Sequence, residues 1–162
     1  MTACCSSTGW DCVCRRNHFH QNINASILME VADAMVSNGL RDAGYVYINL
    51  DDGWAVNRSA DGQMIADPAL FPPSAPGRND GIKLVADYIH KQKLMFGIYT
   101  ARGSVTCLGR PGSDAHELVD ASLWASWGVS QAAAAAATTT WSARGCCCCF
   151  CCCWWWWWWL TG

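Results

Sequence analysis

Ten residues in the first third of the chain place tight limits on its fold. Residues 45–50 form an apolar, aromatic and β-branched run that ends on two carboxylates, Asp51 and Asp52, followed by Gly53 and Trp54. A run of this composition predicts a buried strand of the kind found in parallel sheets. An α/β barrel builds its active-site floor from groups at the C-terminal ends of such strands. The segment therefore indicates an α/β fold with polar chemistry at a strand end.

The flanking residues predict helices and a second strand. Apolar residues recur every three or four positions in residues 24–39, 80–91 and 114–128, as in helices with one buried face. Residues 94–99 form another apolar run directly after the second helix. A strand, a helix and a strand in this order predict parallel pairing of residues 45–50 with 94–99 through a right-handed crossover. We expect the edge of the sheet beyond residues 94–99 to be unpaired.

Three polar positions are candidates for starting these helices. Asn24 and Asp80 each precede an apolar periodic segment, where an N-cap is expected. Asp114 is followed three residues later by Glu117, which is a capping-box pattern.

A series of short motifs runs through residues 17–129. They are NHFHQNI at 17–23, ADAMVSNGLRDAGY at 32–45, LDDGW at 50–54, GIKLVADYIH at 81–90, GIY at 97–99, Thr106 with Cys107, PGS at 111–113 and ASWGV at 125–129. In order and spacing they resemble the α-galactosidases, or melibiases, of the glycoside hydrolase clan that also contains α-N-acetylgalactosaminidases. The resemblance covers 113 of the 162 residues.

The length of the chain limits what this resemblance implies. The family fold is a (β/α)8 TIM barrel, which takes roughly 250 residues, followed by a β-sandwich. The expected fold is therefore α/β, a partial barrel of about the first three βα units. We divide the chain into an irregular cysteine-containing segment at 1–16, the barrel portion at 17–130 and a low-complexity tail at 131–162.

Asp51 and Asp52 are the main candidates for function. From spacing alone, two adjacent acids at a strand end are either ligand-binding groups or solvated loop residues and helix caps. They do not suit the catalytic pair of a retaining glycosidase, which needs two carboxyl groups about 5–5.5 Å apart across the scissile bond, because neighbouring strand residues point to opposite faces. The resemblance implies that they accept hydrogen bonds from galactose hydroxyl groups.

Two further residues are assigned through the same resemblance, and Trp54 is left with two possible roles. Tyr99 matches a sugar-binding tyrosine, although a core aromatic with a solvated hydroxyl group is the alternative. Cys107 matches a cysteine at the family's site, but the partner expected shortly after the nucleophile strand is missing here. Trp54 either lines the pocket or packs under a loop. The substrate-binding set is therefore Asp51, Asp52, Tyr99 and Cys107.

No catalytic residue can be named. The family continues beyond Val129 with a strand that carries the nucleophile in a Lys-x-Asp motif, whereas here Ser130, Gln131 and six alanines follow. We therefore expect an α-galactosidase-type glycoside hydrolase sequence that stops before its nucleophile and acid/base aspartates and is inactive as it stands. The alternatives are a non-catalytic galactoside-binding or interaction fragment, and a mispredicted gene product without function. No cofactor or metal is expected.

The tail consists of homopolymer blocks. Alanine and threonine runs are followed by seven cysteines around Phe150 and by six consecutive tryptophans at 154–159. Such blocks are what trinucleotide repeats give on translation, which favours a mispredicted or read-through coding sequence. A soft-metal cysteine cluster is disfavoured because zinc sites use spaced cysteine pairs. A membrane anchor is disfavoured because the uncharged stretch at 146–160 is shorter than the ~20 residues that span a bilayer.

The remaining features concern partners and location. The net charge of −2 and pI near 6.0 provide no basic footprint for nucleic acid, so the expected partner is an α-galactoside, without nucleic acid or membrane. Residues 1–16 have no apolar core of a secretory signal peptide, and the compartment is unknown although the family is secreted, lysosomal or vacuolar. Gly9-Trp10 resembles the family's first strand but is about three residues too far from Asn17, so we favour a homologous region that begins at Asn17 over a displaced strand.

Overall fold

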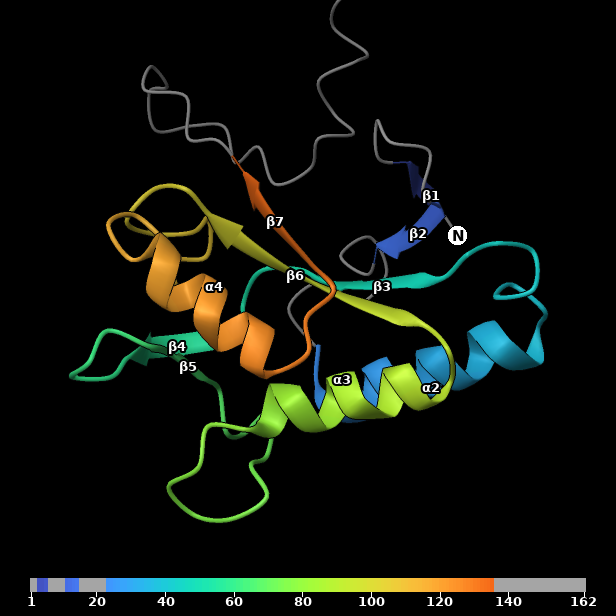
Figure 1. Ribbon diagram of the computed structural model, residues 1–162, viewed down its shortest axis with the longest axis horizontal. Helices are drawn as coiled ribbons and strands as arrows, with labels where there is room; N and C mark the ends of the chain where they lie inside the picture. The colour runs from blue at the N-terminus through green and yellow to red at the C-terminus, as the bar shows by residue number, and fades with distance from the viewer. Residues whose placement is uncertain (1–2, 6–10, 15–22, 136–162) are drawn as a thin grey trace, which may run out of the picture.

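The structure is a computed structural model that describes residues 3–5, 11–14 and 23–135 (Figure 1). These residues form a main sheet, a small hairpin sheet and three helices. In chain order the elements are β1 (Ala3–Cys5), β2 (Asp11–Cys14), α2 (Ala25–Ser37), β3 (Tyr47–Leu50), β4 (Ala55–Arg58), β5 (Met64–Ala66), α3 (Gly81–Lys91), β6 (Met95–Ala101), α4 (Glu117–Ser126) and β7 (Gln131–Ala135).

The centre of the main sheet is the predicted parallel pair. The strand order is β1-β2-β3-β6-β7, and β3 and β6 are parallel with Tyr47 opposite Met95 and Leu50 opposite Ile98. The chain between them passes through α3, as predicted for a βαβ unit. One detail differs from the prediction, because β6 continues to Ala101 and Tyr99 lies inside the strand.

The sheet continues beyond β6, which corrects the expectation of an unpaired edge there. β7 pairs with β6 in parallel, with Gly97 opposite Gln131 and Ala101 opposite Ala135. Residues 131–135, assigned from the sequence to the tail, are therefore a strand. The amide of Ser130 donates to the carbonyl of Phe96 at 2.8 Å, which starts the pairing directly after α4. A vacant strand edge outweighs the helical preference of alanine at this place.

The other side of the sheet also contains strands that the sequence did not predict. β2 lies parallel to β3, and β1 lies antiparallel to β2, within the segment that we expected to be irregular. The motif at 17–22 and the cysteine and tryptophan blocks lie outside the described residues, and so do the predictions that concern the tail beyond residue 135.

The helices begin partly as predicted. Asn24 caps α2, because its side-chain Oδ1 accepts a hydrogen bond from the amide of Ile27 at 3.0 Å. Asp80 makes no such bond to α3 and instead accepts from the amide and hydroxyl of Ser74 at 2.8 and 2.6 Å. The capping box is wrong as well, because α4 begins at Glu117 and no side chain caps it.

Helices and sheet enclose one apolar core. Its fully buried side chains come from α2, β3, β5, α3, β6 and the segment between β5 and α3, and the largest of them are Phe71, Phe96, Leu28, Met35, Ile48, Leu50, Met64, Ile82, Ile89, Ile98 and Val85. Figure 1 shows α2 and α3 side by side below the strands. The hydroxyl group of Tyr88 on α3 donates to Asp33 on α2 at 2.8 Å, which links the two helices at their exposed rim.

A separate hairpin follows β3 and was not predicted. β4 and β5 form a two-stranded antiparallel sheet that reaches out beside α4 (Figure 1). It brings Arg58, at the end of β4, against α4.

Candidate functional site

The two carboxylates lie at the C-terminal end of β3, as predicted. Asp51 and Asp52 are 8% and 6% exposed, respectively. Because Leu50 lies opposite Ile98, the next pair along the two strands brings Asp51 to the level of Tyr99. The structure therefore brings the two acids and the tyrosine to one region of the sheet.

Each carboxylate accepts hydrogen bonds from nearby backbone. Oδ1 of Asp51 accepts from the amide of Asp52, and Oδ1 of Asp52 accepts from the amide of Gly53, both at 2.7 Å. Oδ2 of Asp52 accepts from the amide of Leu108 at 3.0 Å, a residue that is distant in sequence. These bonds hold the carboxylates in place, because a charged acceptor strengthens an N–H hydrogen bond.

Trp54 packs under this region. It is only 4% exposed, and its indole N–H donates to the carbonyl of Tyr99 at 2.9 Å. Its ring meets that of Trp127 edge to face, with the ring centroids 6.0 Å apart. Of the two roles left open by the sequence, the structure supports packing, since the indole is enclosed and its polar atom is occupied.

Cys107 lies on an excursion between β6 and α4 that we call the 103–112 loop. Cys107 is exposed, and it directly precedes Leu108, which binds Asp52. The loop folds back on itself through a β-bridge between Val105 and Pro111. A hydrogen bond of 2.8 Å from the amide of Thr106 to the carbonyl of Arg110 closes its tip.

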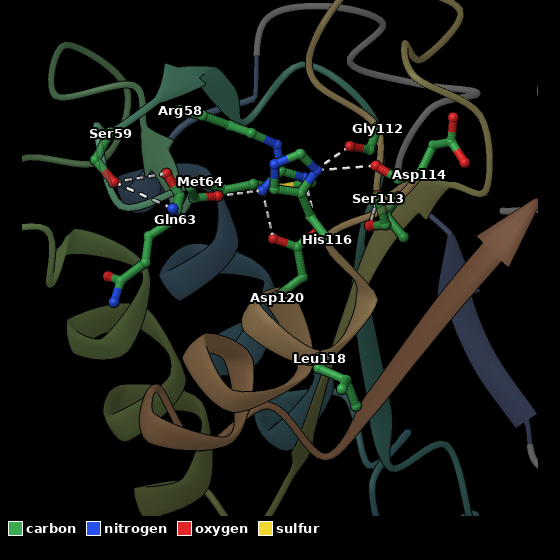
Figure 2. Close-up of polar contacts among 12 residues, drawn as sticks. Arg58, Ser59, Gln63, Met64, Gly112, Ser113, Asp114, His116, Leu118 and Asp120 are labelled. Carbon is green, nitrogen blue, oxygen red and sulfur yellow. Dashed lines mark hydrogen bonds and ion pairs between the residues drawn. The ribbon is translucent and has the colours of Figure 1, made fainter.

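A buried ion pair holds the end of this loop through a hydrogen bond to Gly112 (Figure 2). The sequence analysis did not predict it. Arg58 donates from Nη1 to Oδ1 and from Nη2 to Oδ2 of Asp120, each at 2.7 Å, and Asp120 is fully buried. The same guanidinium also donates to the carbonyls of Gly62 and Gly112. A signal existed in the sequence, because Asp120 shares the buried face of α4 with Leu123 and Trp124.

The described part of the chain also has an open pocket, away from the carboxylates. It measures about 530 Å³ and lies between the hairpin turn and α4, lined by Asp61, Gln63, Leu118, Val119, Ser122, Leu123 and Ser126. Leu118, at its rim, is 85% exposed. None of the four predicted substrate-binding residues lines this pocket.

Among the described residues, no group of three or more histidine, cysteine or acidic side chains is arranged to hold a metal ion. No helix in the part of the chain that the structure describes is long and apolar enough to cross a membrane.

Comparison with known proteins identifies the family. The sequence profile described as alpha galactosidase A, a melibiase, matches residues 7–139, which is most of the chain. The chain belongs to the α-galactosidase family. The resemblance recognised in the short motifs is thus confirmed.

Curated α-galactosidases are similar over the same region. The chain is 50% identical over 113 residues to a probable alpha-galactosidase of Dictyostelium discoideum, and the alignment covers 70% of this chain and 28% of the relative. It is 50% identical over 115 residues to an alpha-galactosidase of Cyamopsis tetragonoloba, covering 70% and 26%. The chain therefore spans about a quarter of the length of these relatives.

Solved α-galactosidase structures have the same fold over this region. Alpha-galactosidase I from Mortierella vinacea superposes with a TM-score of 0.67 at 36% identity, covering 73% of this chain and 28% of that one. The Saccharomyces cerevisiae enzyme, solved with raffinose, superposes with a TM-score of 0.69 at 36% identity, covering 75% and 25%.

The family match extends beyond both ends of the barrel portion that we expect from the sequence. It begins at residue 7, ten residues before Asn17, and so includes β2. At the other end it runs through β7, which the sequence analysis had placed in the tail. The α-galactosidase pattern therefore includes both strands that flank the β3–β6 pair.

Proposed function

We propose that this chain supplies the galactose-recognition part of an α-galactosidase-type site, with Asp51, Asp52 and Tyr99 contacting the sugar and Cys107 at the rim. The observation that carries the proposal is the pair of buried carboxylates at the end of β3, at the level of Tyr99, in a chain that belongs to this family. Carboxylates suit a sugar because its hydroxyl groups are hydrogen-bond donors.

The proposed framework is the first part of a (β/α)8 barrel. The parallel order β2-β3-β6-β7, with a helix in each connection from β2 onward, supports this. In such a barrel the C-terminal ends of the strands form one face, which carries the active site. The carboxylates after β3 lie on that face.

The proposed ligand class is a terminal α-galactoside. A related enzyme from Saccharomyces cerevisiae was solved with raffinose, which supports this class for the present chain. Each carboxylate oxygen that accepts one backbone N–H retains a second lone pair. Asp52 can therefore accept a hydrogen bond from the Leu108 amide and another from a sugar hydroxyl group at the same time.

We further propose that the 162-residue polypeptide binds galactosides without hydrolysing them. Retaining hydrolysis needs a nucleophile and an acid/base group on opposite sides of the scissile bond. Asp51 and Asp52 are adjacent at one strand end and do not supply that pair. Turnover of nitrophenyl α-galactoside by this polypeptide, abolished by Asp51→Asn, would contradict this.

Binding is tested with methyl α-galactoside in a titration followed by ligand-observed NMR. Methyl α-glucoside, its C4 epimer, is the ligand control. We expect Asp51→Asn to weaken galactoside binding by about tenfold or more, the loss typical of one charge-assisted hydrogen bond. Asp87→Asn is the matched control, because Asp87 is half-exposed on α3 and pairs only with Lys83 among the contacts identified for it. Equal affinity for the two sugars, or equal effects of the two variants, would refute the proposal.

A further inference from the structure

The Arg58–Asp120 pair joins three separate parts of the fold. The guanidinium lies between the hairpin, which supplies the carbonyl of Gly62, the 103–112 loop, which supplies the carbonyl of Gly112, and α4, which supplies Asp120. Its side chain is 14% exposed and that of Asp120 is 0% exposed. Four acceptors around one planar group require arginine, because the single ammonium of lysine cannot reproduce the fork.

Backbone contacts join the two arms of the 103–112 loop, so an anchor on one arm also acts on the other. The amide of Gly112 donates to the carbonyl of Ser104 at 2.9 Å, and a β-bridge joins the next residues of the two arms, Val105 and Pro111. A Cβ atom at Gly112 would lie 2.0 Å from the carbonyl oxygen of Gly103, so the two arms of the loop are in direct backbone contact. Fixing Gly112 therefore fixes both arms.

The tip of the loop holds Asp52. The amide of Leu108 donates to Oδ2 of Asp52 at 3.0 Å, and Cδ1 of Leu108 lies 3.3 Å from the Cβ position of Gly53. This is the long-range hydrogen bond identified for the Asp52 carboxylate. The rotamer of Asp52 consequently depends on where the loop tip lies.

We propose that the buried Arg58–Asp120 pair is a positioning device for Asp52, which acts through the 103–112 loop and touches no sugar itself. The role in sugar binding rests on the proposed function, whereas the mechanical link from the pair to Leu108 does not. Arg58 and Asp120 are thus positioning residues of the galactoside site.

The test removes the pair without leaving a buried charge. The double variant Arg58→Met with Asp120→Leu replaces the ions by apolar side chains, an exchange that is often neutral or stabilising for a buried pair. Because Arg58→Met also removes the donor to the carbonyls of Gly62 and Gly112, we expect the midpoint of urea unfolding to fall modestly while the chain stays folded. Hydrogen exchange in peptides covering 104–110 should quicken by about tenfold, and affinity for methyl α-galactoside should fall by about tenfold.

The matched control is the double variant Lys83→Met with Asp87→Leu, which removes a half-exposed ion pair on α3. It should change neither the loop exchange nor the sugar affinity. Arg58→Lys keeps the charge opposite Asp120 and serves if the first variant does not fold. It should quicken exchange in the loop while leaving exchange in β3 and β6 unchanged.

The outcomes separate the two proposals. Unchanged loop exchange in folded variants overturns the positioning role, whether or not the sugar binds. Faster exchange throughout the fold also overturns it, because the pair would then be merely structural. If the unmodified chain binds no galactoside but the loop loosens selectively, the mechanical link is supported and the proposed function fails.

Discussion

Replacement of Gly112 by alanine is a direct test of how tightly the 103–112 loop is packed. An alanine Cβ would lie 2.0 Å from the carbonyl oxygen and 2.9 Å from the carbonyl carbon of Gly103, and 3.1 Å from the amide nitrogen of Val105. All three are backbone atoms, so no side-chain rotation relieves the clash. The two arms of the loop must separate by about 1 Å to reach the shortest tolerated contact.

The expected cost follows from that displacement. Overpacking of this kind costs about 1–3 kcal/mol. The shift also weakens the hydrogen bond of 2.7 Å from Nη2 of Arg58 to the carbonyl of Gly112, and a bond to a charged group contributes about 1.5–3 kcal/mol. We expect Gly112→Ala to lower the free energy of unfolding by about 3 kcal/mol.

Gly109→Ala, in the same loop, is the matched control. Gly109 has a φ of +70° but nothing within 4 Å of its Cβ position. Alanine there should cost only the left-handed backbone strain, about 1 kcal/mol. Urea unfolding followed by far-UV circular dichroism measures both variants, since eleven tryptophans make fluorescence hard to assign. Equal losses for the two variants would refute the argument that Gly112 is held by backbone contact.

Three further changes test the core, a cap and an acid. Phe96→Ala, at a fully buried position, should lower the free energy of unfolding by about 3–5 kcal/mol in urea denaturation; a loss near zero would contradict the observed core. Asn24→Ala should cost about 1 kcal/mol in the same assay, because α2 loses the bond to Ile27. Hydrogen bonds from Ser74 hold the pKa of the Asp80 carboxyl below its ordinary value. Ser74→Ala should therefore raise that pKa in an NMR titration. The associated stability is present above the unfolded pKa near 3.8 and is lost as the pH falls through the folded value, so an unchanged titration in the variant would contradict the assigned cause.

The parts of the fold that the sequence predicted well are those encoded locally. The parallel pairing of β3 with β6 follows from two apolar runs separated by one amphipathic helix. The cap at Asn24 is also local, because its side chain accepts a hydrogen bond from the amide of Ile27, only three residues later. Asp80 shows the limit of such reasoning. It lies at the expected N-cap position, but its carboxylate accepts hydrogen bonds from Ser74 instead of from the first amides of α3.

The elements that the sequence did not predict depend on distant neighbours. Residues 131–135 form β7 because β6 offers an open edge, whereas isolated alanines favour a helix. The pair of Arg58 with Asp120 joins residues 62 positions apart. An acid on the buried face of α4 signalled that a partner exists, although no local pattern identifies which basic residue it is.

For this chain, the sequence by itself determined the family, the central βαβ unit and the strand end that carries Asp51 and Asp52. It could do so because hydrophobic periodicity, capping and short motifs act over a few residues. Only the tertiary structure decided that an alanine run adds a strand to the sheet, that Trp54 is a packing residue and that the 103–112 loop holds Asp52. These outcomes depend on contacts between residues that are far apart in the sequence. A buried charge needs an ionic or hydrogen-bonding partner and a strand edge needs a neighbouring strand, and the local sequence does not say which residues supply them.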